Sequence, residues 1–321
     1  MKFTRACLVA PRKFGFFEVD EEPGEGQVLL KIASCGLCNW ELNFWDGNMK
    51  LGEYPMKLGH EFAGEVVKLG PGVKRLKVGD HVSAIPDGLN FGGFAQYRVT
   101  SEKECQLLAP GIDPVYALGE PQKCVMTVLR ATAAEPGDFG VVLGVGPMGM
   151  WCVQALAGKS LAGLIAIDIN DAKLAMAKQF GATHVINSKN EDAQARIREI
   201  TDGHMADFVI EGTGINAVFN AAQDYLRAGR GRLILMSSHH DSGEFDFRKA
   251  IDLCAEIIVP HPGFSQDPWD DFRRTVQLIN NGTFVTKPLV THEFKLSEIE
   301  KAFDMLEHKP AGFNKGIVIP D

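Results

Sequence analysis

The chain has 321 residues, of which 45% are hydrophobic and 23% are charged, and its formal net charge is −8. This length favours two domains, and the composition is that of a folded globular protein rather than a disordered one. The acidic balance, with no basic tract, argues against a nucleic-acid partner. No apolar run is long enough for a signal peptide or a membrane span, so we expect a cytoplasmic protein that binds small molecules.

The first part of the chain, up to about residue 119, alternates short β-rich runs with turns that contain Gly and Pro. The runs cover residues 6–9, 26–33, 64–69, 81–84 and 94–99. This pattern predicts a β-rich, barrel-like domain. The seven cysteines are scattered and odd in number, which favours free thiols or metal ligands over disulfides.

The second part, from Phe139, alternates strand-like and helix-like segments. Strands are predicted at 140–143, 164–168, 184–186, 207–210, 232–236 and 257–260, and helices at 148–157, 171–180, 192–200 and 216–226. This alternation predicts an α/β fold with a doubly wound parallel sheet. The tail, with predicted helices at 269–280 and 296–306 and a strand at 316–319, is too short to fold alone. The predicted domains are therefore 1–120 with 263–321, and 121–262.

A glycine-rich turn follows the first of these predicted strands. Gly144, Gly146 and Gly149 occupy its first, third and sixth positions, with Pro147 and Met148 between them. Such a turn lets a pyrophosphate approach backbone N–H groups at a helix N-terminus, which predicts a dinucleotide site. Asp168 ends the next strand, where a carboxylate accepts the ribose hydroxyls; the alternatives are a helix N-cap or a solvated strand end.

Four further residues belong to the predicted cofactor site. Lys173 is placed to reach the same ribose, although solvation on a helix face is the alternative. Thr213, Ser237 and His239 follow the fourth and fifth strands, at the carboxyl ends where ligands collect in this fold. His261, after the sixth strand, is either another site residue or an exposed loop residue. No positive charge follows Asp168 at positions 169 and 170, so the sequence favours NAD over NADP.

A candidate metal site is formed by His60 and Glu61, which lie between glycines, and by Cys38 upstream of them. Imidazole, carboxylate and thiolate are all zinc ligands. A lone His is more often a core or surface residue, so the rest of the chain must support this interpretation. Cys35 and Cys38 also fit a redox Cys-x-x-Cys pair, but they do not open a helix, and we expect Cys35 to be a buried thiol.

Taken in order, these motifs and the Glu120-Pro121 pair near the predicted domain boundary resemble the zinc-dependent medium-chain dehydrogenase/reductase family. Its members join a GroES-like catalytic domain to a Rossmann domain. Carried over position by position, the resemblance implies the zinc ligands Cys38, His60, Glu61 and Glu120, with Glu41 orienting the histidine. Two alternatives stay open: Glu61 pairs with a basic neighbour instead, and Glu120 is a carboxylate of the domain hinge.

The chain departs from the family pattern at two places. The segment 84–93 lacks the four cysteines that hold a structural zinc in many members, so one catalytic zinc per chain is expected. Trp40 replaces the Ser or Thr that passes on the substrate proton, and an indole N–H cannot accept one. The proton then leaves through metal-bound water with Glu61, through Asp46 or through a nearby His. Trp40 and Trp45 are either a wall for a sugar or polyol, or core residues.

The resemblance implies a zinc-dependent enzyme that transfers hydride between NAD and a secondary hydroxyl of a polyol, a sugar or a related polar alcohol. Two alternatives are a ketone reductase of a biosynthetic pathway and an NAD(H)-binding zinc protein with little catalysis that serves as a sensor or scaffold. A homodimer or homotetramer is expected, with the predicted strand 257–260 as the edge along which subunits pair.

Overall fold

The computed structural model describes residues 1–239, 241–260 and 262–321, so His261 lies outside the described residues. The chain divides into two compact units, Met1–Lys123 with Trp269–Asp321, and Cys124–Pro268. Both boundaries fall slightly later in the chain than the predicted ones. The first is displaced because helix α2 (Gly119–Thr132), which the sequence analysis missed, runs through it. Pro121 suggested a break there, yet proline is tolerated in the first turn of a helix.

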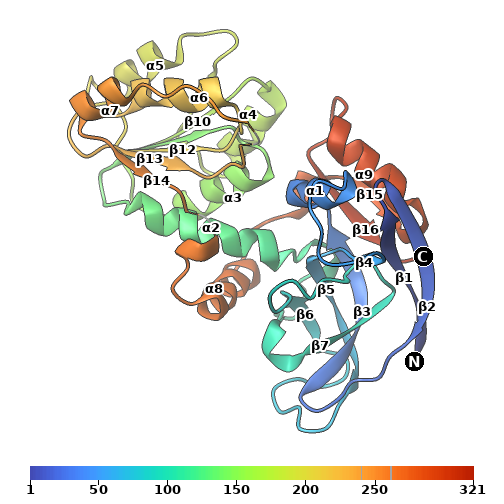
Figure 1. Ribbon diagram of the computed structural model, residues 1–321. Coiled ribbons are helices and arrows are strands. Elements are labelled where there is room, and N and C mark those ends of the chain that lie inside the picture. The colour runs from blue at the N-terminus through green and yellow to red at the C-terminus, as the bar shows by residue number, and fades with distance from the viewer. Residues whose placement is uncertain (240, 261) are drawn as a thin grey trace. The chain divides into compact units, whose positions relative to one another are not determined.

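The first unit is built on two β-sheets (Figure 1). A three-stranded sheet has the order β2-β1-β4, formed by β1 (Lys2–Ala10), β2 (Lys13–Asp20) and β4 (Met56–Lys57). A seven-stranded sheet has the order β15-β16-β3-β5-β6-β8, with β7 paired to β3; its strands are β3 (Gln27–Gly36), β5 (Glu61–Leu69), β6 (His81–Ala84), β7 (Tyr97–Ser101), β8 (Cys105–Leu107), β15 (Val290–Lys295) and β16 (Lys315–Ile319). Strands β2, β4, β8 and β15 were not predicted.

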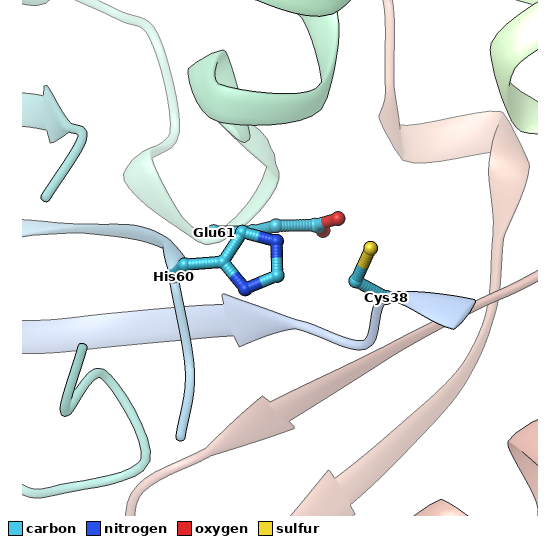
Figure 2. Close-up of side chains that lie close together, drawn as sticks. All are labelled: Cys38, His60 and Glu61. Carbon is cyan, nitrogen blue, oxygen red and sulfur yellow. The ribbon is translucent and has the colours of Figure 1, made fainter. Parts of the chain in front are cut away.

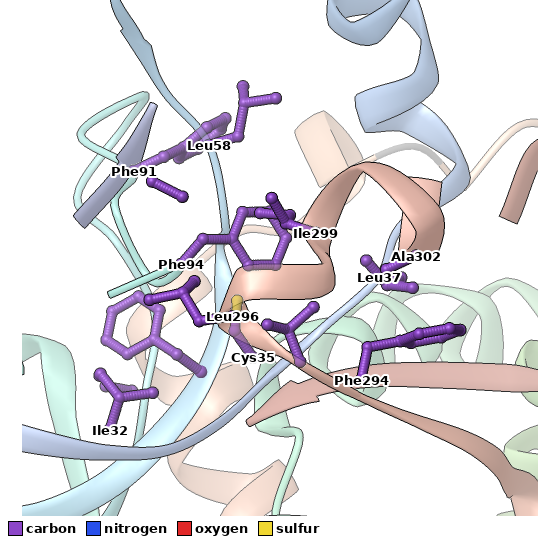
Figure 3. Close-up of a cluster of buried hydrophobic side chains, with 14 of the residues drawn as sticks. Ile32, Cys35, Leu37, Leu58, Phe91, Phe94, Phe294, Leu296, Ile299 and Ala302 are labelled. Carbon is purple, nitrogen blue, oxygen red and sulfur yellow. The ribbon is translucent and has the colours of Figure 1, made fainter. Parts of the chain in front are cut away.

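The carboxyl-terminal tail completes this unit, as predicted. Strand β16 pairs antiparallel with β3, with Val318 opposite Cys35, and this register carries Lys315 toward the segment that follows β3. Helix α9 (Ile299–His308) buries Ile299, Ala302, Phe303 and Leu306, which recur on one face at helical spacing. Figure 3 shows side chains of the tail in the same buried cluster as Leu37, Leu58 and Phe94. This shared core explains why the tail does not form a unit of its own.

Two further helices belong to the first unit. Helix α1 (Leu42–Trp45) follows a 3₁₀ turn at Asn39–Glu41, and helix α8 (Pro268–Asn280) begins at the unit boundary. Among the described residues, no helix is both long enough and apolar enough to cross a membrane.

The second unit contains a parallel sheet of six strands in the order β11-β10-β9-β12-β13-β14. Its strands are β9 (Phe139–Leu143), β10 (Gly163–Asp168), β11 (His184–Asn187), β12 (Phe208–Glu211), β13 (Arg232–Leu235) and β14 (Glu256–Ile258). Its helices are α3 (Pro147–Leu156), α4 (Asp171–Gln179), α5 (Ala193–Ile200), α6 (Asn216–Ala221) and α7 (Phe247–Leu253). The predicted doubly wound sheet is confirmed, and its strand order reverses between β9 and β12.

Two details of this unit differ from the prediction. The expected helix 216–226 is the short α6 followed by a 3₁₀ turn at Ala222–Tyr225, and helix α7 was not predicted. Strand β14 ends at Ile258, before Pro260. A proline has no N–H to donate to a strand ladder, which fits a strand that stops short of it.

Candidate metal and cofactor sites

Strand pairing brings the three central residues of the predicted metal site together. Gly36 lies opposite Glu61 in the β3–β5 ladder, so the chain just after β3, at Cys38, meets the chain just before β5, at His60. Gly59 allows this approach because its φ is +90° and an added Cβ would lie 2.6 Å from the backbone N of Phe94. One ligand atom from each of Cys38, His60 and Glu61 lies within 4.8 Å of the others (Figure 2).

The orientation of His60 is fixed by Glu41. The Nδ1 atom of the buried imidazole lies 2.9 Å from Oε1 of Glu41, which also accepts a hydrogen bond of 2.7 Å from the backbone N–H of Gly59. The contact expected for Glu41 is therefore present. Burial alone would lower the pKa of His60, but the carboxylate of Glu41 and the neighbouring Cys38 raise it well above its ordinary value. With Nδ1 engaged, Nε2 is the nitrogen left for a metal.

Glu61 has a basic partner that the sequence analysis did not identify, Lys315. Its Nζ atom lies 2.5 Å from Oε2 of Glu61 and donates a hydrogen bond of 2.9 Å to the backbone oxygen of Leu37. Both side chains of the pair are buried, at 1% exposure for Glu61 and 7% for Lys315. Burial raises the pKa of Glu61 while Lys315 opposes the shift; the pKa of Lys315 is raised by Glu61 despite burial. Glu61 thus pairs with a basic neighbour and also lies beside Cys38 and His60.

Glu120 lies in the first turn of α2, near the same imidazole. Its Oε2 atom is 3.8 Å from Nε2 of His60, and its Oε1 atom is 3.3 Å from Nζ of Lys123. Of the two interpretations of Glu120, this proximity favours the metal set.

The donor set suits zinc. One thiolate, one imidazole and two carboxylates are all ligand types of a tetrahedral zinc site, and any three of them would leave the fourth position open for a substrate. The charges also balance, because Lys123 and Lys315 each neutralise one carboxylate of the set. Burial raises the pKa of the Cys38 thiol and the imidazole of His60 opposes this; a metal would hold the thiolate form.

Another group of possible ligands occurs in the described part of the chain: Asp304, Glu307 and His308, near the end of α9. These residues are more exposed, and Glu307 pairs with Arg12. Such acidic groups on a helix surface are common without a metal.

The aromatic residues near the metal set divide into two groups. Trp40 is half-buried, and its ring centroid lies 5.9 Å from that of His60. Trp45 is only 3% exposed, and its ring packs on Phe14 and Phe303 at 5.7 Å and 5.2 Å. Of the two interpretations of Trp45, the structure therefore supports the core residue, because α1 turns its side chain into the core. Asp46, one of the suggested proton carriers, forms an ion pair of 2.7 Å with Arg12.

The glycine-rich turn of the second unit leaves space for a ligand to approach the protein backbone. Gly144 has a φ of +87°, and a Cβ on Gly149 would lie 2.1 Å from the backbone oxygen of Gly144, so neither position accepts a larger residue. Gly146, by contrast, would meet nothing within 4 Å and is the N-cap of α3, with Pro147 and Met148 next in the helix. This geometry fits a pyrophosphate at the start of α3.

Asp168 lies beside this turn. Its Oδ2 atom accepts a hydrogen bond of 3.0 Å from the backbone of Val145, and its Oδ1 atom accepts bonds from the backbone of Ile169 and Asn170. The N-cap of α4 is Asn170, so the N-cap interpretation of Asp168 is wrong. Lys173 is half-buried in the first turn of the same helix. Adjacent parallel strands β9 and β10 place the turn and the carboxylate together.

The remaining predicted cofactor residues surround a buried carboxylate that the sequence analysis missed. Glu211 ends β12 and accepts hydrogen bonds from the backbone N–H and hydroxyl of Thr213 and from the hydroxyl of Ser237. Nε2 of His239 lies 3.2 Å from Glu211, and its Nδ1 lies 2.5 Å from Oδ1 of Asn216. An acidic residue at the end of a buried apolar strand, followed by Gly212-Thr213-Gly214, was the available signal.

Comparisons with known proteins match most of the chain. Residues 24–110 match the family described as alcohol dehydrogenase GroES-like domain, and residues 147–281 match the family described as zinc-binding dehydrogenase. The chain is 30% identical to a sorbitol dehydrogenase of Halalkalibacterium halodurans, covering 94% of this chain and 96% of that protein. It is 28% identical to an L-threonine 3-dehydrogenase of Pyrococcus horikoshii, covering 92% of each.

Solved structures show the same fold. The crystal structure of 2R,3R-butanediol dehydrogenase from Bacillus subtilis has a TM-score of 0.85 and 25% identity, covering 99% of this chain and 100% of that one. A protein described as a zinc-binding dehydrogenase, from Sinorhizobium meliloti 1021 and bound to NADP, has a TM-score of 0.87 and 21% identity, with both chains fully covered. By the sorbitol dehydrogenase match and the two family matches, this chain belongs to the zinc-dependent medium-chain dehydrogenase/reductase family, as an oxidoreductase with a GroES-like domain and a Rossmann-like domain.

Proposed function

We propose that this protein is an NAD-dependent zinc dehydrogenase that oxidises a secondary hydroxyl of a polyol, a sugar or a related polar alcohol. The observation that carries the proposal is the set of Cys38, His60, Glu61 and Glu120, of which His60 and Glu61 are buried and Cys38 and Glu120 half-buried; it offers carboxylates where a second thiolate would stand. The sorbitol and butanediol dehydrogenases among the similar proteins support a substrate with several hydroxyl groups. This step from relatives to substrate is an analogy.

The roles of the chain's own residues follow from their contacts. Zinc held by this set would polarise the substrate oxygen as a Lewis acid. Glu41 keeps the imidazole of His60 turned toward the metal, and Lys315 holds the carboxylate of Glu61 beside it. Trp40 bounds the space next to His60 and takes no proton, since its indole N–H is only a donor. Glu61 is the acceptor we propose for the proton of the substrate hydroxyl.

A panel of polyols, sugars and hydroxy amino acids, assayed for NADH formation by zinc-loaded protein, tests the proposal. Turnover of at least one secondary alcohol is expected. If the corresponding ketones consume NADH while no alcohol reacts, the protein is a ketone reductase instead. If the protein binds zinc and NAD but catalyses neither alcohol oxidation nor ketone reduction, it is a cofactor-binding sensor or scaffold and the proposal fails.

NAD is the proposed cofactor because Asp168 stands beside the glycine-rich turn and would repel a 2′-phosphate. Changing Asp168 to Asn is expected to weaken NADH binding by about 10-fold and to reduce the preference over NADPH by at least as much, since a charged hydrogen bond contributes roughly 1.5–3 kcal/mol. Fluorescence titration with NADH and NADPH measures both quantities. Asp202→Asn, an exposed change in the same unit, is the matched control. Unchanged discrimination in Asp168→Asn would mean that another residue selects the cofactor.

A single zinc per chain is predicted. The segment 84–93 has no cysteine, and the other possible ligand group lies at the exposed end of α9. Elemental analysis of the purified protein should therefore return one zinc per subunit, and a value near two would contradict this.

We also propose that the protein forms a homodimer or homotetramer through strand β14. This strand is the outer strand of its sheet; Ile257 in it and Val259 just after it expose 43% and 56% of their surface. Nearby apolar residues of α7, Phe247 and Ile251, are each 70% exposed. An uncovered edge with apolar side chains favours strand pairing between subunits.

A further inference from the structure

The segment 85–93, which connects β6 to β7, carries none of the cysteines that hold the corresponding region of many family members, yet it lies against the metal set. The backbone N–H groups of Gly92 and Gly93 both donate to the carbonyl oxygen of Gly59, at 3.1 Å and 2.9 Å. Gly59 directly precedes His60. The position of this segment is therefore coupled to the position of a proposed metal ligand.

Phe91 is the side chain through which the segment contacts the site. It is 4% exposed and belongs to the buried cluster drawn in Figure 3. Its ring centroid lies 5.1 Å from the imidazole of His60 and 5.9 Å from Trp40. Phe91 and Trp40 thus pack on His60 together, while Glu41 holds the imidazole at Nδ1.

Arg98, on β7, holds this segment in place. It is only 3% exposed, and its two terminal nitrogens donate hydrogen bonds of 2.6 Å to the backbone oxygens of Asn90 and Phe91. Its guanidinium lies over the ring of Phe62 at 4.6 Å, and Glu104 is 3.8 Å away. The planar guanidinium presents two donors in a fixed geometry, which a lysine ammonium does not reproduce.

The backbone N–H groups of Asn90 and Phe91 bond to Asp87 and Leu89, whereas their carbonyl oxygens accept from Arg98. A cavity of about 310 Å³ adjoins both residues on the side of Arg98, and Arg5 and Lys57 also border it. The charge-assisted bonds from Arg98 replace the contacts that packing would otherwise supply.

We propose that Arg98 is a positioning residue of the metal site. By fixing the backbone of Asn90 and Phe91, it keeps the ring of Phe91 on His60. The segment has no cysteines with which a structural zinc could hold it instead. The inference rests on the proposed zinc site and goes beyond it, because it assigns to Arg98 an effect on metal affinity although Arg98 contacts no ligand.

The test compares Arg98→Lys with Arg75→Lys. Arg75 is an exposed arginine of the same unit that also donates to backbone oxygens, those of Glu102 and Cys105, and it serves as the matched control. Zinc affinity is measured by competition with a chelator, without any substrate. Arg98→Lys should raise the zinc dissociation constant roughly 10-fold, at the low end of the effect of changes beyond the ligands, and Arg75→Lys should leave it unchanged.

Amide hydrogen exchange adds a readout that a general loss of stability would not reproduce. The amides of Gly92 and Gly93 should lose protection in Arg98→Lys while those of β3 and β5 keep theirs. Equal zinc affinity and equal protection in both variants would overturn the proposal. Wild-type protein that binds no zinc would instead remove the proposed site itself, so the two failures are distinguishable.

A second variant covers the case in which Arg98→Lys does not fold. Phe91→Leu keeps Arg98 and its backbone bonds but removes the ring from His60. It should weaken zinc binding by a similar factor while Gly92 and Gly93 stay protected. Wild-type zinc affinity in Phe91→Leu would show that the ring does not support His60, and the proposal would then be wrong.

Discussion

Cys38→Ser should lose zinc and activity together. A serine hydroxyl is not ionised at neutral pH and is a poor ligand for zinc, whereas the thiolate is the softest donor of this set. Apparent zinc-binding free energies of about 10–16 kcal/mol shared among about four ligands imply a loss of roughly 100-fold or more in affinity. Chelator competition measures the affinity, and turnover of whichever substrate the panel identifies should fall in proportion to bound zinc.

Cys35→Ser is the control for this prediction. Cys35 lies on β3, three positions before Cys38, is fully buried, and is not part of the metal set. It should retain zinc and most of the activity. Equal losses in the two variants would support the redox Cys-x-x-Cys pair, and full activity in Cys38→Ser would mean that the metal is held elsewhere.

The outline of the fold was predictable because it depends on local patterns. The period of apolar residues distinguishes strands from helices, and Gly144 and Gly149 of the glycine-rich turn are needed by the backbone itself. Helix α2 was missed because Pro121 is a break signal everywhere except in a first turn. The side of Trp45 stayed undecided because a short helix such as α1 has too few residues to reveal which side faces the core.

The candidate site was only partly predictable for a different reason. Cys38, His60 and Glu61 carry their chemistry in their side chains, so a short motif identifies them. Lys315 does not: it meets Glu61 from 254 residues further along the chain, through the pairing of β16 with β3. Arg98 and Glu211 were missed for the same reason. Their hydrogen-bond partners come close to them only in the folded protein.

Lys315→Met should destabilise the metal-free protein strongly. The change leaves the carboxylate of Glu61 buried without its cation, and breaking a buried ion pair in this way costs about 3–5 kcal/mol. Zinc provides a new partner for that carboxylate, so zinc should stabilise the variant more than it stabilises the wild type. At the same time Glu61 loses the cation that shares its carboxylate and is held more tightly by the metal, so it becomes a poorer proton acceptor and kcat should fall. Thermal unfolding with and without zinc measures the first effect, and steady-state kinetics the second.

The pH dependence of unfolding gives an independent check on the same pair. Because Glu61 raises the pKa of Lys315 above its ordinary value of 10.5, the folded protein holds this proton more tightly than the unfolded chain does. The resulting stabilisation is complete below the ordinary pKa and is lost as the pH rises through the folded one. The wild type should therefore lose stability above about pH 10.5 more steeply than Lys315→Met, which has no such group to titrate.

Lys315→Arg, which keeps the charge, separates the ion pair from simple packing. It should retain most of the stability and kcat, because a guanidinium can still bond to Glu61 and to the backbone oxygen of Leu37. If Lys315→Met is as stable as the wild type without zinc, the pair contributes nothing measurable to the fold. If it also keeps its kcat, Lys315 does not tune Glu61 at the metal, and the position of that carboxylate must come from the register of β5 alone.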